Sequence, residues 1–359
     1  MPDLPPLARL PLLVLGMLSL LGGVLAGLAR LDWTMPAIGA GAAGWHGALM
    51  ISAFLGTVIS LERAVAIGRI WAYLAPACAG LGGIALLAGA PLTLAQGLGV
   101  AAAFVLLAAS GSVLQRLAAP FTLLLAIAAL CWLIGNALWF HGAELHLAVP
   151  WWLAFLVLTI FGERRELARF VPLSEKARRG YIAMVVVQVG ALVVLAVPWH
   201  EHPIAGGLWW LSMSLFSGWL LRYDLACRPK VHRFGWALHT ARSLRLGYTW
   251  LMLAGLWGVV NALRGMPLDS PGPLHMLLLG FVFSMVFGHA PIMLPALLRT
   301  PISPPGPFAF VPVGLMTLGV TLRAVGDAIG SSGVRAGAGA LQAAAILTFA
   351  FTMIRHLRR

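Results

Sequence analysis

Apolar stretches of about twenty residues recur along the whole chain and constrain its fold more than any other feature. A helix that crosses a lipid bilayer needs about 20 mostly apolar residues. Only 10% of the 359 residues are charged and 60% are hydrophobic, whereas soluble domains carry about 25% charged residues. The chain is therefore predicted to be an integral membrane protein, with the lipid bilayer as its main partner.

The apolar stretches predict twelve membrane-spanning helices in an all-α, polytopic fold. An open sheet cannot cross lipid, and the chain lacks the alternating pattern of a membrane barrel. The predicted spans are residues 9–30, 43–64, 70–90, 94–114, 119–140, 148–163, 180–198, 204–222, 240–263, 274–297, 308–326 and 337–356. The sixth span is short unless its helix continues into the charged segment 163–166. No convincing internal repeat occurs, so we predict one transmembrane domain over residues 1–359.

Basic residues are distributed unevenly between the two sides of this arrangement. With both termini in the cytoplasm, only Arg30, Arg264, Arg323 and Arg335 of the 24 basic residues fall outside. This asymmetry follows the positive-inside rule and predicts a multi-pass protein of the bacterial inner membrane. The net charge of +13 then reflects topology and anionic lipid, and not nucleic acid. Three widely separated cysteines predict neither a disulfide framework nor a zinc site.

Two histidines begin predicted spans on the same side of the membrane. His46 begins the second span and His275 begins the tenth, and both helices run from outside to inside. Ionisable residues at membrane depth are costly and usually mark function. We predict that the two imidazoles ligate one haem iron axially, with Gly44 and Gly47 leaving room for the macrocycle. The alternative is that both are interfacial histidines bonded to backbone or water.

A third histidine lies deeper in the tenth span. His289 follows His275 by 14 residues, which at 100° per residue places both on one face of an α-helix, about 21 Å apart. A second haem between His289 and His239 is one interpretation, and a metal or gas site at His289 is another. A packed histidine near Pro291 is the third.

Arg323 lies near the outer end of the eleventh span. A buried guanidinium there needs an anion, and haem propionates would accept a bidentate contact. The alternative partner is Asp327, which lies four residues later on the same side of the helix.

Two further groups of polar residues lie near the span ends. Histidine and carboxylate residues gather outside, where copper or another metal is predicted to bind; they are His141, Glu144, His146, His200 and His202. On the inner side, Glu62-Arg63 and the segment 163–166 end the second and sixth spans. These inner charges are interpreted as salt-bridged anchors, with a proton-uptake point as the alternative.

The plan resembles the heme-copper oxidase subunit I architecture: twelve spans, a histidine on helix two, a histidine on helix ten and an arginine on helix eleven. The resemblance implies that His46 and His275 hold a low-spin haem and that Arg323 meets its propionates. That family has a His-x-His pair on helix ten and a copper-ligating histidine on helix six. Here Met276 and Leu277 follow His275, and span six holds no histidine, so oxygen reduction is not expected.

The chain also resembles the NnrS family of twelve-span bacterial proteins associated with haem, copper and the nitric oxide response. The likeness lies in the segment Trp45-His46-Gly47-Ala48-Leu49-Met50 and in the segment from His275 to Gly288-His289. It implies a haem b protein with one or two haems that handles nitric oxide or another diatomic gas, or transfers electrons to a redox partner. A transporter or a metal- or haem-handling permease is the alternative. Enzyme status and a homo-oligomeric state stay open.

Overall fold

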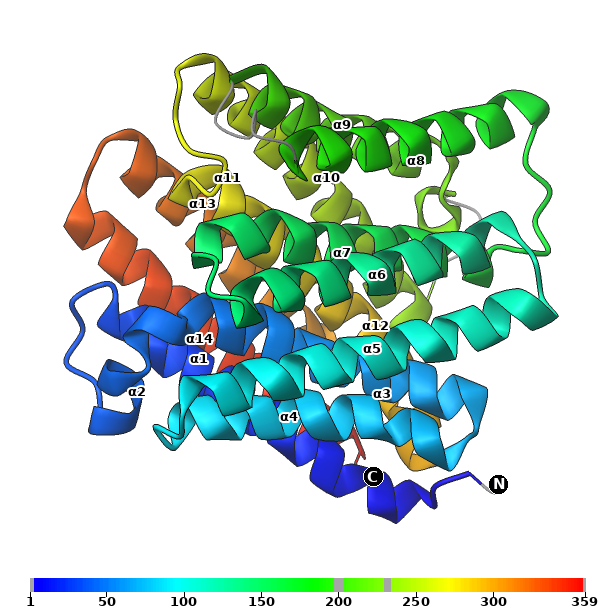
Figure 1. Cartoon of the computed structure of the whole chain (residues 1–359), viewed down its shortest axis with the longest axis horizontal. Helices are drawn as coiled ribbons and strands as arrows, with labels where there is room; N and C mark the ends of the chain where they lie inside the picture. Colours follow the sequence, from blue (N-terminus) through cyan, green and yellow to red (C-terminus); the bar gives the residue numbers. More distant parts are fainter. Residues whose placement is uncertain (1–2, 197–202, 229–233, 358–359) are drawn as a thin grey trace. The chain divides into compact units, whose positions relative to one another are not determined.

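The computed structural model describes residues 3–196, 203–228 and 234–357, and every regular element in these ranges is helical (Figure 1). Within them, 12 helices are long and apolar enough to cross a membrane. The predictions of an all-α fold and of twelve spans are confirmed. The chain is a polytopic membrane protein.

The chain forms two compact units. The first unit comprises Met1–Glu166 with Ala296–Arg299, and the second comprises Leu167–Pro295 with Thr300–Arg359. Each unit is described by itself, and the prediction of one transmembrane domain stays a prediction.

The first unit contains the first six spans. Its helices are α1 (Leu10–Ala29), α2 (Ala37–Gly41), η3 (Ala48–Leu55), α3 (Gly56–Ile67), α4 (Leu74–Leu87), α5 (Leu92–Arg116), α6 (Pro120–Phe140) and α7 (Leu145–Leu167). Consecutive helices α4, α5 and α6 lie side by side (Figure 1), and α1 packs against η3 and α4. The segment η3 is buried along its whole length, so it lies in the interior of this unit.

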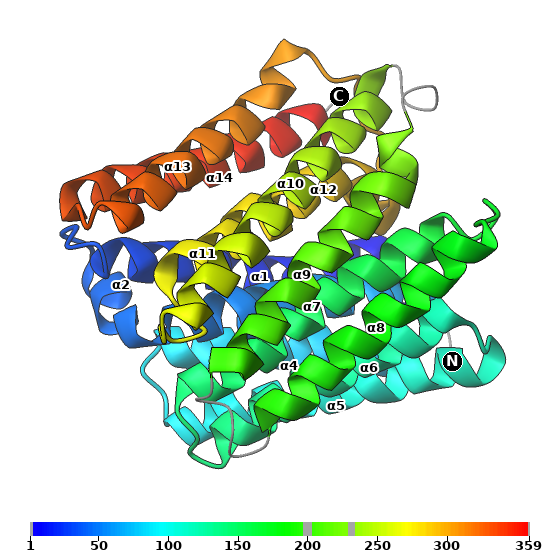
Figure 2. The same ribbon diagram turned by 90° about the horizontal axis from the view of Figure 1, so that it is seen from above.

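The second unit contains the last six spans. Its helices are α8 (Glu175–Ala196), α9 (Pro203–Tyr223), α10 (Gly235–Leu263), α11 (Pro271–His275), η6 (Met276–Val282), α12 (Phe283–Leu298), α13 (Val311–Ala328) and α14 (Ser332–Leu357). Figure 2 shows α8, α9 and α10 as neighbours and α13 paired with α14. The segment η6 packs against α10 and α13.

Helix ends follow local chemistry. Proline opens α6 at Pro120 and α11 at Pro271, where a missing backbone N–H costs nothing and the fixed φ suits a helix. Gly68 ends α3 in the left-handed conformation, with φ of 65°, which glycine adopts without steric cost. The sixth span continues through the charged segment to Leu167, as its length required.

Two π-helical segments interrupt the spans. The second span begins with η3 and the tenth contains η6, with eight and seven residues respectively. In a π-helix each N–H bonds the carbonyl five residues earlier. Such segments are rare in proteins, and those that occur often lie at functional sites. Each π-helical segment begins close after a histidine that the sequence singled out: His46 lies two residues before η3, and His275 lies one residue before η6.

Candidate functional site

The imidazole of His46 packs against α1 in the first unit. Its Nδ1 lies 2.7 Å from the carbonyl oxygen of Gly23. A carbonyl oxygen can only accept, so Nδ1–H is the donor. In the neutral ring this tautomer places the lone pair on Nε2, and a backbone bond at the other nitrogen is the usual arrangement of histidines that ligate metals.

Glycine makes room for this ring. A Cβ atom at Gly27, one turn along α1 from Gly23, would lie 2.7 Å from Cε1 of His46. The His46 imidazole therefore occupies the volume that a side chain at Gly27 would need. Near His46 itself, a Cβ at Gly44 or Gly47 would meet nothing within 4 Å; the room for a macrocycle beside the ring stays a prediction.

His275 has the same hydrogen-bond pattern in the second unit, formed within its own helix. Its Nδ1 lies 2.7 Å from the carbonyl oxygen of Pro271, four residues earlier. The ring therefore adopts the same tautomer as His46. His46 and His275 belong to different units, and their pairing on one haem stays a prediction.

His289 lies on α12, and its Nδ1 donates to the carbonyl oxygen of Met285 at 2.9 Å. The π-helical segment η6 lies between His275 and His289. A π-helical turn holds more residues than an α-helical turn, so the 100° arithmetic does not apply across this interval. That His275 and His289 lie on one face of the helix stays a prediction, and the spacing of 14 residues no longer supports it.

His239, the predicted partner of His289, is fully buried in the second unit. Its Nε2 lies 3.0 Å from the carbonyl oxygen of Ala309, and its ring contacts Trp236 and Phe310 at centroid distances of 5.3 and 5.0 Å. Nδ1 is buried and has no partner among the described residues. His239 thus uses the opposite ring nitrogen from the other three histidines.

Arg323 is buried and faces Asp327 in the second unit. Its Nε lies 3.4 Å from Oδ2 of Asp327, and Arg335 lies 3.8 Å from the other carboxylate oxygen. The alternative partner considered from the sequence is therefore present. A propionate contact at Arg323 stays a prediction.

The outer histidine group is described only in part. In the first unit, Nδ1 of His146 lies 3.2 Å from Oε2 of Glu144, and both side chains are largely exposed; the ring of His141 contacts Phe140. His200 and His202 lie outside the described residues. Among the residues that are described, no three His, Cys, Asp or Glu side chains come together as a metal site.

The inner charged segments meet in the first unit. Nη1 of Arg63 lies 2.8 Å from Oε2 of Glu166, so an ion pair joins the inner ends of α3 and α7. The interpretation of these segments as salt-bridged anchors is confirmed for this pair.

Residues 9–358 match the family described as a domain of unknown function, DUF8744. The chain belongs to this family. The match covers the helices of both units, and the family description states no activity. No curated protein matches this DUF8744 chain.

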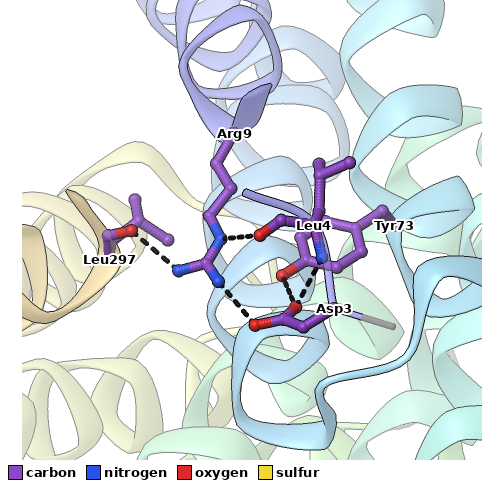
Figure 3. Close-up of polar contacts among 5 residues, drawn as sticks. All are labelled: Asp3, Leu4, Arg9, Tyr73 and Leu297. Carbon is purple, nitrogen blue, oxygen red and sulfur yellow. Dashed lines mark hydrogen bonds and ion pairs between the residues drawn. The ribbon is translucent and has the colours of Figure 1, made fainter. Parts of the chain in front are cut away.

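Arg9 of the DUF8744 protein is a buried arginine whose role the sequence did not predict. From the sequence, it counted only as one of the basic residues that set the topology. Arg9 is 1% exposed and bonds Asp3 at 2.6 Å, the carbonyl of Leu4 at 3.0 Å and the carbonyl of Leu297 at 2.8 Å (Figure 3). Tyr73 donates to the same aspartate at 2.7 Å. This Arg9 network joins the N-terminal segment, the third span and the end of α12.

The Leu297 carbonyl has a clear need for this donor. It belongs to the last turn of α12, where carbonyls lack intrahelical partners, and the residue four positions later is Pro301, which has no N–H. The Arg9 guanidinium supplies the missing donor. The sequence does not reveal this role of Arg9, because Arg9 and Leu297 are 288 positions apart and only the folded chain brings them into contact.

A polar network in the interior of the first unit was also missed. Ser52 on η3 donates to Oδ1 of Asn136 at 2.8 Å and accepts from Nε1 of Trp132 at 3.1 Å. Asn136 is fully buried, and its Nδ2 has no partner among the described residues. One serine and one asparagine inside apolar runs give little sequence signal, because only the packing of η3 against α6 brings them together.

Proposed function

We propose that this DUF8744 protein binds haem b in the bacterial inner membrane and handles nitric oxide or another diatomic gas, or transfers electrons. His46 and His275 would each supply an imidazole ligand, and Arg323 would hold a propionate. The observation that carries the proposal is shared by the two histidines: each donates Nδ1–H to a backbone carbonyl, and each lies within two residues of the start of a π-helical segment. That tautomer presents Nε2 as the ligating nitrogen.

When bound, haem supplies the redox chemistry, while the chain sets ligation and access. The backbone carbonyls of Gly23 and Pro271 fix the orientation and tautomer of the two rings. Gly27 keeps the volume that His46 needs. Both histidines would be used to hold the haem, so the proposal does not assign a catalytic residue.

A transporter or permease is the second candidate, and the Ser52–Asn136–Trp132 network favours it. Polar groups buried among apolar spans are costly and commonly mark a solute or ion path. Under this candidate, Asn136 Nδ2 would donate to a passing solute, and loss of Asn136 would abolish uptake without changing any cofactor.

An optical spectrum of the purified protein, oxidised and reduced, distinguishes the two candidates. The haem proposal predicts a low-spin Soret spectrum with iron near one per chain, and loss of haem or a high-spin spectrum in His46→Ala and in His275→Ala. His356→Gln is the matched control, because His356 bonds Ser303 and has no proposed ligand role. A protein expressed with haem supply that shows no Soret band overturns the proposal.

Two further measurements address the finer assignments. If His289 and His239 hold a second haem, His289→Ala halves the haem content and leaves the first spectrum intact. If the outer group binds copper or another metal, a variant lacking His141, His146, His200 and His202 loses that metal in elemental analysis. Unchanged haem and metal content in these variants removes both assignments.

A further inference from the structure

The inner ends of α3 and α7 carry six charged side chains in the first unit. They are Glu62, Arg63, Glu163, Arg164, Arg165 and Glu166, here named the α3–α7 charge cluster. Both helices are candidate membrane spans, so these charges are held at the end of an apolar bundle. Such positions are costly for charge and usually functional.

One ion pair occupies the strongest contact of the α3–α7 charge cluster. Nη1 of Arg63 lies 2.8 Å from Oε2 of Glu166, and the Arg63 side chain is only 10% exposed. Glu166, at 26% exposed, is therefore the carboxylate to which Arg63 is committed. Among the described residues, Glu166 is the carboxylate that accepts a hydrogen bond from this guanidinium.

Glu163 is left in a different situation. Its Oε1 is buried and has no hydrogen-bond partner among the described residues. The charges that act on it are Glu62 and Arg63 from α3, together with Arg164 and Glu166 from its own helix. The cluster thus holds three carboxyl groups and three guanidinium groups, and the buried oxygen of Glu163 accepts a hydrogen bond from none of the described residues.

A buried carboxylate oxygen without a donor is expensive, because it loses hydration and gains no hydrogen bond in return. Binding one proton neutralises this carboxyl group and removes that cost. Of the carboxyl groups on α7, Glu163 gains most from protonation, because Glu166 is already paired with Arg63.

We propose that Glu163 is a proton-binding site, at which the carboxylate takes up one proton to become a neutral carboxylic acid and releases it again. Glu62, the neighbouring carboxyl group on α3, sets the occupancy of the site through its charge. Reversible protonation of a membrane-embedded carboxyl group is the step that proton-coupled membrane proteins use. The site is independent of haem, and it is tested in protein prepared with or without cofactor.

A hydrophobic carbodiimide tests the proposal, because dicyclohexylcarbodiimide adds as a whole molecule to protonated carboxyl groups in apolar surroundings. In the full-length protein in detergent, we expect labelling of Glu163 to exceed labelling of Glu166 by on the order of tenfold, because Glu163 has a buried oxygen without a donor whereas Glu166 is paired with Arg63. Labelling at Glu163 should fall as pH rises. Peptide mass spectrometry locates the adduct, and Glu163→Gln, which keeps the side-chain shape, should lose it.

Two neighbouring variants separate proton binding from simple accessibility. Glu166→Gln frees Arg63 to balance Glu163, so labelling of Glu163 should drop. Glu62→Gln removes a negative charge next to Glu163 and should also lower the labelling of Glu163. Both variants are close in shape to the native side chain, and size-exclusion chromatography checks their folding. Equal labelling of Glu163 and Glu166, or labelling of Glu163 that neither variant changes, overturns the proposal.

Discussion

His46 and His275 share a hydrogen-bond pattern but are held by different parts of the structure. The acceptor for His275 is Pro271, one turn earlier in the same helix. The acceptor for His46 is Gly23 on α1, 23 residues away, and its ring fills the space above Gly27. The orientation of His275 is therefore local to its helix, whereas that of His46 depends on how α1 packs.

The π-helical segments that follow the two histidines also differ in whether contacts to another helix hold them. Segment η6 contains only apolar side chains and glycine, whereas η3 contains Ser52, which is tied to α6 through Asn136 and Trp132. The first unit thus holds its histidine and its π-helical segment by tertiary contacts. Changes to helix packing should disturb His46 and leave His275 in place.

The largest effect is expected from Arg9→Ala, which removes the guanidinium that holds the start of α1. Asp3 and the Leu297 carbonyl would lose their partner (Figure 3), and breaking a buried ion pair from one side costs about 3–5 kcal/mol. Reversible unfolding in detergent measures this loss.

Arg178→Ala is the matched control in the second unit, because Arg178 forms an exposed pair with Glu175. An exposed ion pair is screened by solvent and contributes little to stability. A loss for Arg9→Ala no larger than for Arg178→Ala would contradict the importance assigned to the Arg9 network.

A smaller effect is expected from Gly27→Leu, which places a side chain in the volume of the His46 ring. Overpacking of this kind costs about 1–3 kcal/mol. Gly44→Ala is the control, because a Cβ there meets nothing within 4 Å. If the ring is the source of the clash, the cost of Gly27→Leu should shrink by about 1 kcal/mol in a His46→Ala background. The same cycle with His275→Ala should show no coupling, and coupling to both histidines would refute the comparison.

The smallest effect is expected from Ser52→Ala, which leaves Asn136 and Trp132 without their common partner. Hydrogen bonds between membrane helices average about 0.6 kcal/mol, so we expect a loss of roughly 1 kcal/mol in unfolding free energy. Ser112→Ala is the control, because that hydroxyl bonds the carbonyl of Ala109 in its own helix. Equal losses would mean that Ser52 does not tie η3 to α6.

The spans were predictable because the hydropathy of each apolar run reflects the free energy of moving that segment from water into lipid. This free energy does not depend on the other runs. The sixth span shows the limit of this reasoning. Its apolar part ends at Gly162, yet the helix continues to Leu167, and Arg63 from another helix pairs with Glu166 in this continuation. The π-helical segments were not predictable, because their residues are ordinary apolar helix formers and only the backbone bonding distinguishes them.

The amino-acid sequence alone determined that the chain is a twelve-span helical membrane protein and which histidines lie at the ends of its spans. Hydropathy decides these features, and it is a property of each segment. Only the tertiary structure decided the partners of three buried polar groups: Gly23 for His46, Leu297 for Arg9 and Glu166 for Arg63. Hydrogen bonds and ion pairs act over a few ångströms, so they depend on which helices pack together, and hydropathy does not specify that.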